Sequence, residues 1–461
     1  MVYFHIKDKE MKISRVVIAG TTSGVGKTSI TCAIIYGLKN KGYSVQPFKV
    51  GPDYIDPSYL SAISGNAARN LDSWIMGETA TLESFTKNST SDISVVEGVM
   101  GYYDGFSGAT NQSSTHHIAT ILKAPVILIL DASKTARSIA ATALGYVKFH
   151  KNSRIVGLIL NKLGSKKHEE MCRVALSNLK IPILGCIPKN SELDLESRHL
   201  GLIPVSEQTF LENKIKKIAK TLVQFIEIDK IIQISRTDNS LSSKTNQQLK
   251  KSKTTIAVAL DKSFNFYYYD NFDSLRRNGA RIEFFSPISD KSPPECSGIY
   301  IGGGFPEVLG KPLAQNQSMK KSIKKFAEQG MPIYAECGGL MYLTKSIEYN
   351  TKKYSMVGFF DASTSMEKKM TLNYTRANVI SNCVIAKNST KLFGHEFHYS
   401  ELNSLPKDTK FAYELSIGVG IRNRKDGLID NNTLASYMHL YFDRASHSKN
   451  FIDNCVGFSR S

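Results

Sequence analysis

A strand-like run that leads into a glycine-rich turn constrains the fold of this chain more than any other stretch. Val16-Val17-Ile18-Ala19 is apolar and favours a strand, and a helical pattern follows the turn from Ser29 to Leu38. Backbone N–H groups in such a turn, together with the positive end of the next helix, bind phosphate. The sequence therefore predicts a nucleotide-binding loop made of Gly20, Thr21, Ser23, Gly24, Val25, Gly26, Lys27 and Thr28.

Two residues of this loop have predicted chemical roles. Lys27 would reach the outer phosphates, and the Thr28 hydroxyl would be a ligand of Mg²⁺. The spacing from Gly20 to Gly26 is one residue longer than in the common pattern. A glycine-rich turn with a surface lysine is the plainer alternative, but the strand before the turn and the helix after it favour the phosphate site.

Length and composition limit the class of protein. A chain of 461 residues is expected to form two or three domains, and no apolar run approaches the roughly 20 residues that span a bilayer. The first ten residues lack the apolar centre of a signal peptide. Seven scattered cysteines without a CxxC pair disfavour disulfides and a zinc site and indicate a cytoplasmic protein. We expect no membrane contact.

The net charge of +18 indicates an anionic substrate or simply a lysine-rich background. The lysines are spread along the chain, and no basic helix with interleaved aromatic residues occurs, so we expect no nucleic-acid partner.

Alternating strand and helix patterns organise the first half of the chain. The predicted strands are Ile13–Ala19, Ser44–Lys49, Ile93–Val96, Val126–Leu130, Ile155–Leu160 and Ile183–Cys186. This alternation is typical of a doubly wound α/β domain, whose ligands bind at the carboxyl ends of the strands. A polar stretch then separates it from a second α/β domain. We predict an N-terminal extension (1–12), a P-loop domain (13–235), a linker (236–254), a second domain (255–446) and a C-terminal tail (447–461).

Acidic residues follow two of these strands at the predicted ligand edge. The loop after the second strand carries Lys49, Asp53 and Asp56, and the third strand ends at Glu97, with Asp104 in the next loop. Glu97 occupies the position where P-loop proteins hold their second Mg²⁺ carboxylate. Hydrogen bonds that cap the loops are the alternative role of these acids. His116 and His117 are interpreted as surface and packing residues, because the side chains of adjacent helical residues diverge and cannot easily bind one metal together.

The second half contains a cysteine in a nucleophile-elbow pattern. A predicted strand ends at Cys337, and Gly338-Gly339 leads into a helix. A helix start stabilises a thiolate, and we expect Gly303, Gly304 and Gly338 to supply N–H groups for an oxyanion hole. A buried structural cysteine is the alternative. Among the downstream histidines, His439 ends an apolar run and is preferred as the base over His395. His395 and His398 should face opposite sides of one strand.

Taken together, these motifs resemble the cobyrinic acid a,c-diamide synthase family of glutamine-dependent corrinoid amidotransferases, from about residue 13 to residue 442. The similarity rests on Gly20–Thr28, Lys49–Pro57, Asn70–Asp72, Glu97–Gly105, Arg198–Leu202, Phe264–Tyr268, Gly302–Glu307, Ala335–Leu343, Gly394–Ser400 and Ala435–Leu440. The longer P-loop spacing is itself similar to this family and to dethiobiotin synthetase.

The resemblance implies a dethiobiotin-synthetase-like first domain and a class I glutaminase as the second, with Cys337 as nucleophile and His439 as base. Class I glutaminases usually have an acidic residue two positions after the histidine, and this chain has Tyr441 there. Corrinoid amidotransferases commonly lack that acid. Asn373 and Leu260 stand where the family often has glycine and arginine.

The implied activity is that of a carbon–nitrogen ligase that amidates the a and c acetates of cobyrinate through an acyl phosphate. ATP, L-glutamine and Mg²⁺ would take part, with Thr28, Asp53 and Glu97 at the metal, and Lys49, Tyr54, Asp56 and Asp104 at the corrinoid. Nickel-sirohydrochlorin as substrate, cobyric acid synthase-type amidation, and a P-loop regulatory ATPase are the alternatives. Assembly as a homodimer is left open.

Overall fold

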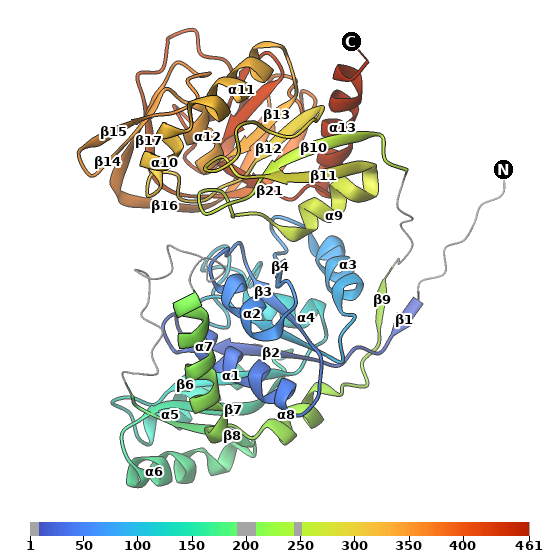
Figure 1. Cartoon of the computed structure of the whole chain (residues 1–461). Helices are drawn as coiled ribbons and strands as arrows, with labels where there is room; N and C mark the ends of the chain where they lie inside the picture. Colours follow the sequence, from blue (N-terminus) through green and yellow to red (C-terminus); the bar gives the residue numbers. More distant parts are fainter. Residues whose placement is uncertain (1–8, 191–208, 244–250, 461) are drawn as a thin grey trace, which may run out of the picture. The chain divides into compact units, whose positions relative to one another are not determined.

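The computed structural model describes residues 9–190, 209–243 and 251–460. The chain divides into two compact units, with the boundary between residues 246 and 247 (Figure 1). The resemblance motif Arg198–Leu202 lies outside the described residues.

Unit 1 contains a seven-stranded sheet in the order β4-β3-β5-β2-β6-β7-β8. All of its neighbouring strands run parallel. Its strands are β2 (Arg15–Gly20), β3 (Val45–Val50), β4 (Arg69–Leu71), β5 (Ile93–Glu97), β6 (Val126–Asp131), β7 (Ile155–Leu163) and β8 (Ile183–Pro188). The predicted doubly wound α/β fold is therefore confirmed for this unit.

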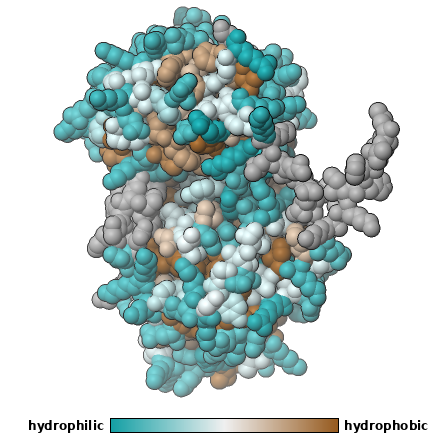
Figure 2. Space-filling model, turned by 45° about the vertical axis from the view of Figure 1, so that its right-hand side comes forward, coloured by the Kyte–Doolittle hydropathy of each residue, from teal (hydrophilic) through white to brown (hydrophobic). Residues whose placement is uncertain are grey.

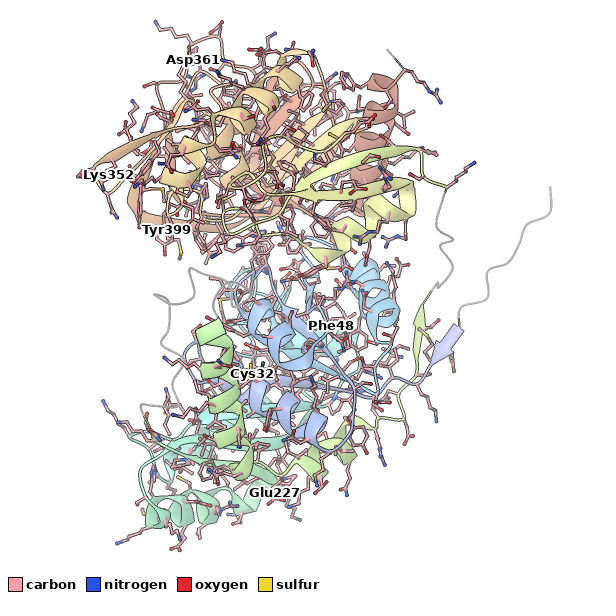
Figure 3. The ribbon with its side chains drawn as sticks, viewed as in Figure 1. Cys32, Phe48, Glu227, Lys352, Asp361 and Tyr399 are labelled. Atoms are coloured by element: carbon pink, nitrogen blue, oxygen red, sulfur yellow. The ribbon has the colours of Figure 1, made fainter. Side chains whose placement is uncertain are left out.

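Helices cover both faces of this sheet. One face carries α1 (Lys27–Asn40), α2 (Asp56–Ser64), α7 (Thr209–Leu222), α8 (Ile228–Ser235) and the 3₁₀ turn Val223–Phe225. The other carries α3 (Glu78–Asn88), α4 (Thr115–Ile121), α5 (Ser138–Lys148), α6 (Lys166–Leu176) and the 3₁₀ turn Ser177–Leu179. Side chains alternate along β2 between the two cores, as strand geometry requires. Cys32 belongs to the first core and Phe48 to the second (Figure 3).

Two short strands change the predicted boundaries of unit 1. β1 (Lys9–Met11) pairs antiparallel with β9 (Leu241–Ser243). Residues 9–11 were expected in an N-terminal extension and residues 241–243 in a polar linker, and both expectations are wrong for these residues. Backbone pairing needs no long apolar pattern, and the single apolar residue Leu241 is buried in the same core as Ile13.

Unit 2 is built around one mixed sheet. Its parallel part runs β11-β10-β12-β13-β20, with β10 (Thr254–Ala259), β11 (Ala280–Phe285), β12 (Gly298–Ile301), β13 (Ile333–Glu336) and β20 (Thr433–Ser436). The sheet continues through β14 (Ser346–Tyr349), β15 (Lys352–Ser355), β16 (Ser363–Val379), β17 (Lys391–Asn403), β18 (Phe411–Ile417), β19 (Lys425–Asp430) and β21 (Met438–Leu440). Lys352 on β15 and Tyr399 on β17 are labelled in Figure 3.

The helices of unit 2 are α9 (Tyr269–Asn278), α10 (Gly310–Gln315), α11 (Gln317–Glu328), α12 (Gly338–Leu343) and α13 (His447–Phe458), with a 3₁₀ turn at Arg444–Ser446. Helix α13 contradicts the predicted C-terminal tail. Phe451, Ile452 and Cys455 are buried against the sheet, and their spacing is that of one helical face.

The outer surface is mostly hydrophilic in the view of Figure 2. Exposed lysines such as Lys352 account for part of the high positive charge. Among the described helices, none combines the length and the apolar composition needed to cross a membrane.

Candidate active sites

The glycine-rich loop of unit 1 lies between the end of β2 and the start of α1. Gly24 and Gly26 have φ angles of 74° and 93°, which glycine adopts without steric cost. A Cβ atom on Gly20 would collide with the side chain of Val25, so the loop folds closely over the strand end. Left-handed residues in such a turn are typical of phosphate-binding nests, in which successive backbone N–H groups face an anion.

Lys27 connects this loop with the segment that follows β5. Its Nζ donates hydrogen bonds to the carbonyl oxygens of Thr22 (3.0 Å) and Met100 (2.6 Å). Burial, reinforced by the nearby charge of Lys49, lowers the pKa of Lys27 to about 8. A bound polyphosphate would favour the charged form, because an opposite charge at close range raises the pKa of an ammonium group.

Glu97 joins the loop to the neighbouring strands. Its Oε1 accepts hydrogen bonds from Thr28 Oγ1 (2.7 Å) and Lys49 Nζ (2.8 Å). Its Oε2 is buried and has no hydrogen-bond partner among the described residues. Burial raises the pKa of Glu97 in spite of Lys49. The carboxylate therefore presents one oxygen for which the described residues supply no partner, directly beside the loop threonine.

Lys49 brings two of the predicted acids together. Its Nζ lies 2.6 Å from Asp56 Oδ2 and 3.8 Å from Asp53 Oδ2. Burial alone would lower the pKa of Lys49, but the carboxylates of Asp56 and Glu97 outweigh it and raise that pKa. The sheet thus brings Asp53 and Asp56, from the segment after β3, close to Glu97 at the end of β5, as the adjacent carboxyl ends of parallel strands predict.

The remaining predicted acids of unit 1 also stabilise their own loops. Asp53 Oδ1 accepts hydrogen bonds from the backbone N–H groups of Ile55 (2.8 Å) and Asp56 (3.2 Å). Asp104 Oδ2 accepts one from the Gly101 N–H (2.9 Å) and is exposed. Tyr54 is half-buried in the same loop as Asp53. Asp53 therefore both caps its loop and lines the site, while Asp104 caps its loop and its charge also acts on Lys27.

Cys337 forms a strained elbow between β13 and α12. Its φ of 48° is unfavourable for a residue with a side chain. The backbone N–H of Cys337 donates to Ser436 O (2.7 Å), and its thiol donates to Phe397 O (3.4 Å). The predicted strand–elbow–helix arrangement is present, and this backbone strain is typical of a nucleophile elbow.

The glycine loop after β12 packs directly against this elbow. The Gly339 N–H donates to Gly302 O (3.0 Å). A Cβ atom on Gly338 would lie 3.0 Å from the Gly304 nitrogen, and one on Gly303 would lie 2.6 Å from His439 Cε1. The three residues predicted for an oxyanion hole are therefore brought together, and larger residues would separate the elbow from the histidine.

The register of the strands distinguishes the histidines that were considered as the base of Cys337. His439 on β21 pairs with His395 on β17, and their rings stack with centroids 4.9 Å apart. The His398 ring stacks instead on Tyr437 at 3.7 Å. His447 lies on α13 with its Nδ1 3.2 Å from Ile385 O. Because His439 also borders Gly303, it is the histidine on the glycine-loop side of the elbow.

The electrostatics of Cys337 contradict one expectation. Burial and then the carboxylate of Glu307 raise the pKa of the Cys337 thiol, although the Gly338 N–H acts in the opposite direction. The predicted thiolate stabilisation at the helix start is outweighed, because α12 has only six residues and the sulfur is buried. The thiol form therefore prevails in the ligand-free protein.

Replacement of Glu307 by glutamine is expected to make Cys337 more reactive. Burial raises the pKa of Glu307 to about 7, so above about pH 8 its charge opposes thiolate formation. Glu307→Gln should lower the thiol pKa and speed alkylation by iodoacetamide, by about tenfold for each pKa unit. The exposed Glu328→Gln serves as the matched control. Slower or unchanged alkylation of Glu307→Gln would contradict this account.

Comparisons with known proteins match each unit to a domain family. Residues 16–203 match the CobQ/CobB/MinD/ParA nucleotide binding domain, and residues 255–447 match the CobB/CobQ-like glutamine amidotransferase domain. The cobyrinate a,c-diamide synthase of Methanosarcina barkeri is 39% identical, with 95% of each chain covered. The chain belongs to the cobyrinate a,c-diamide synthase family. The enzyme of that name from Dehalococcoides mccartyi is 43% identical over 97% of this chain and 99% of its own.

Membership in the cobyrinate a,c-diamide synthase family makes this protein a nucleotide-binding, glutamine-dependent amide ligase. The solved structure of chloroplast FtsY from Physcomitrella patens covers 40% of this chain and 61% of its own, at a TM-score of 0.30 and 17% identity. That likeness is too low to carry an argument.

Two further residues support the phosphate loop and were not predicted. Asn161 Nδ2 donates to Val25 O (2.9 Å), and Lys162 Nζ donates to Gly24 O (3.0 Å) and to Asp131 Oδ2 (2.9 Å). Both lie near the carboxyl end of β7, a strand whose presence was predicted. Their place at the ligand edge of the sheet was the signal that could have identified them.

Proposed function

We propose that this protein amidates the a and c acetate carboxylates of cobyrinate with ATP and L-glutamine, a step of cobalamin biosynthesis. One observation carries the proposal: the chain combines a phosphate loop beside buried carboxylates with a strained cysteine elbow whose adjoining glycine loop borders a histidine. The family supports the choice of substrate, because its members with full-length similarity are called cobyrinate a,c-diamide synthase.

Unit 1 would activate the carboxylate. A carboxylate does not react with ammonia, because its leaving group would be oxide, and transfer of the ATP γ-phosphoryl group gives an acyl phosphate that does react. The loop N–H groups and Lys27 would hold the phosphates and neutralise developing charge. We assign corrinoid contacts to four residues at the same sheet edge: Lys49 near the end of β3, Tyr54 and Asp56 just after that strand, and Asp104 after β5.

The residues beside the loop fit a magnesium ion. When bound, Mg²⁺ supplies charge neutralisation of the phosphoryl oxygens. Thr28 and Glu97 would hold it, with Asp53 nearby. Glu97 Oε2, which has no hydrogen-bond partner in the described part of the chain, supports this assignment. Within the described residues no group of three or more His, Cys, Asp or Glu side chains is arranged to hold a metal. This agrees with the habit of Mg²⁺ in nucleotide sites, where phosphates and waters complete the shell.

Unit 2 would release ammonia from glutamine. Cys337 attacks the side-chain amide while His439 takes the thiol proton, and the N–H groups of Gly303, Gly304 and Gly338 stabilise the oxyanion. The carbon–nitrogen bond breaks, His439 returns the proton to the leaving ammonia, and water hydrolyses the thioester to glutamate. All seven cysteines are free, and the need for a reduced Cys337 supports a cytoplasmic location.

The direct test is amidation of defined tetrapyrroles by the purified protein. With ATP, Mg²⁺ and glutamine, cobyrinate should gain two amides on its a and c acetates, seen as two successive products by mass spectrometry. Nickel-sirohydrochlorin and cobyrinate a,c-diamide are the comparison substrates. Faster turnover of either would assign the protein to nickel-sirohydrochlorin diamidation or to cobyric acid synthase-type amidation. ATP hydrolysis without any amidation would indicate a regulatory ATPase.

A further inference from the structure

Glu336 is a buried carboxylate that directly precedes the elbow cysteine and has no part in the chemistry described so far. It is the last residue of β13 and is 1% exposed. Its Oε1 accepts hydrogen bonds from Tyr334 Oη (2.7 Å) and from the Leu440 N–H (3.0 Å), and its Oε2 accepts one from Tyr300 Oη (2.8 Å). Three donors therefore hold the carboxylate in one orientation.

The same carboxylate faces the predicted base. Glu336 Oε2 lies 3.5 Å from His439 Nδ1, and both side chains are buried. This distance is long for a hydrogen bond, as catalytic contacts often are before the substrate binds. The hydrogen bond to Leu440 fixes the backbone of the next residue, so Glu336 restrains His439 both through its ring and through its strand.

His395 and Gly303 approach other parts of the His439 ring. The His395 ring stacks on the His439 ring, and the Nδ1 of His395 lies 3.1 Å from Tyr268 Oη. The Cε1–Nε2 edge of His439 borders Gly303, since a Cβ there would lie 3.3 Å from Nε2. A proton held on Nδ1 by Glu336 leaves Nε2 as the acceptor, on the side of the oxyanion loop.

We propose that Glu336 is the positioning residue of the glutaminase site, and that it orients His439 and stabilises the imidazolium formed when the Cys337 proton is taken. The strand that leads into the nucleophile thus also supplies the acid that orients the base. In other nucleophile–base pairs, a buried carboxylate on the second ring nitrogen has this role.

The inference rests on the proposed function. Measuring glutamine hydrolysis by the wild-type protein distinguishes a failure of the proposed function from a failure of the inference about Glu336. Glu336→Gln should lower kcat for glutamine hydrolysis by about 10²-fold or more. The KM for glutamine should stay within about twofold, and ammonia-driven amidation should be unchanged, because neither depends on the orientation of His439. A wild-type protein that hydrolyses no glutamine would overturn the proposed function itself.

Two further variants separate positioning from a structural role. Glu396→Gln changes another buried carboxylate, which lies on β17 and accepts a hydrogen bond from the Val419 N–H (2.7 Å). This variant should keep kcat within about fivefold of wild type. If Glu336 acts through His439, the double variant Glu336→Gln/His439→Ala should be no slower than His439→Ala alone.

Two results would overturn the inference while the wild type remains active. One is a Glu336→Gln protein with wild-type kcat, and the other is a double variant whose loss equals the product of the two single losses. If Glu336→Gln does not yield folded protein, Glu336→Asp replaces it, because it keeps the charge and withdraws it from His439 by one methylene. A wild-type kcat in Glu336→Asp would then overturn the inference, and a loss of kcat alone would support it.

Discussion

Cys337→Ser is expected to abolish glutamine-dependent amidation while leaving ammonia-dependent amidation intact. The serine hydroxyl is a far weaker nucleophile at neutral pH than a cysteine sulfur, and here the sulfur is the group at the elbow. We expect a loss of at least about 10⁴-fold with glutamine, in line with removal of a catalytic nucleophile. Product formation is measured with glutamine and with ammonium chloride at raised pH, since unprotonated ammonia is the reactant.

Cys383→Ser provides the matched control for this experiment. Cys383 is half-buried in unit 2, and its thiol donates to Ala386 O (3.5 Å), a contact that a serine hydroxyl can replace. This variant should use both nitrogen sources at the wild-type rate. Equal loss of both activities in Cys337→Ser would contradict the division of labour between the two units.

Glu97→Gln should instead lose activity with both nitrogen sources, because phosphorylation of the carboxylate precedes attack by any ammonia. The substitution removes the charge beside Thr28 and Lys49 and replaces one carboxylate oxygen by an amide group. A loss of about 10³-fold is expected, comparable with removal of one preorganised electrostatic group. The rate is measured against Mg²⁺ concentration with glutamine and with ammonium chloride.

Asp92→Asn tests whether any acid next to β5 has the same effect. Asp92 is exposed, and its side chain accepts hydrogen bonds from the backbone N–H and the hydroxyl of Ser44. The Asp92→Asn protein should retain full activity with both nitrogen sources. A Glu97→Gln protein that keeps wild-type turnover at low Mg²⁺ would show that Glu97 has a structural role only.

Residue pattern alone predicts much of unit 1, because the relevant signals are local. The strand, glycine turn and helix at 16–38 specify one another within a few residues, and the predicted strands match the observed ones to within about three residues. The edge occupied by Lys49, Asp56 and Glu97 also follows from sequence, since parallel strands place their carboxyl ends together.

Non-local contacts explain the predictions that failed. The antiparallel pairing of β1 with β9 joins residues more than two hundred positions apart, and no local pattern specifies it. Helix α13 has a helical spacing of apolar residues, but only the sheet beneath it shows that they are buried. The thiol pKa of Cys337 also depends on non-local contacts, because burial and Glu307 raise it more than the Gly338 N–H lowers it.

Local residue patterns are enough to predict the phosphate loop, the cysteine elbow and the two-domain α/β organisation, because each depends on neighbouring residues and their backbone preferences. The groups that meet across strands are known only from the folded chain. The register between β17 and β21 places His395 and His439 on one face, and the end of β13 places Glu336 beside His439. These contacts depend on the alignment of strands that are far apart in the chain. Residue types and local spacing do not specify that alignment.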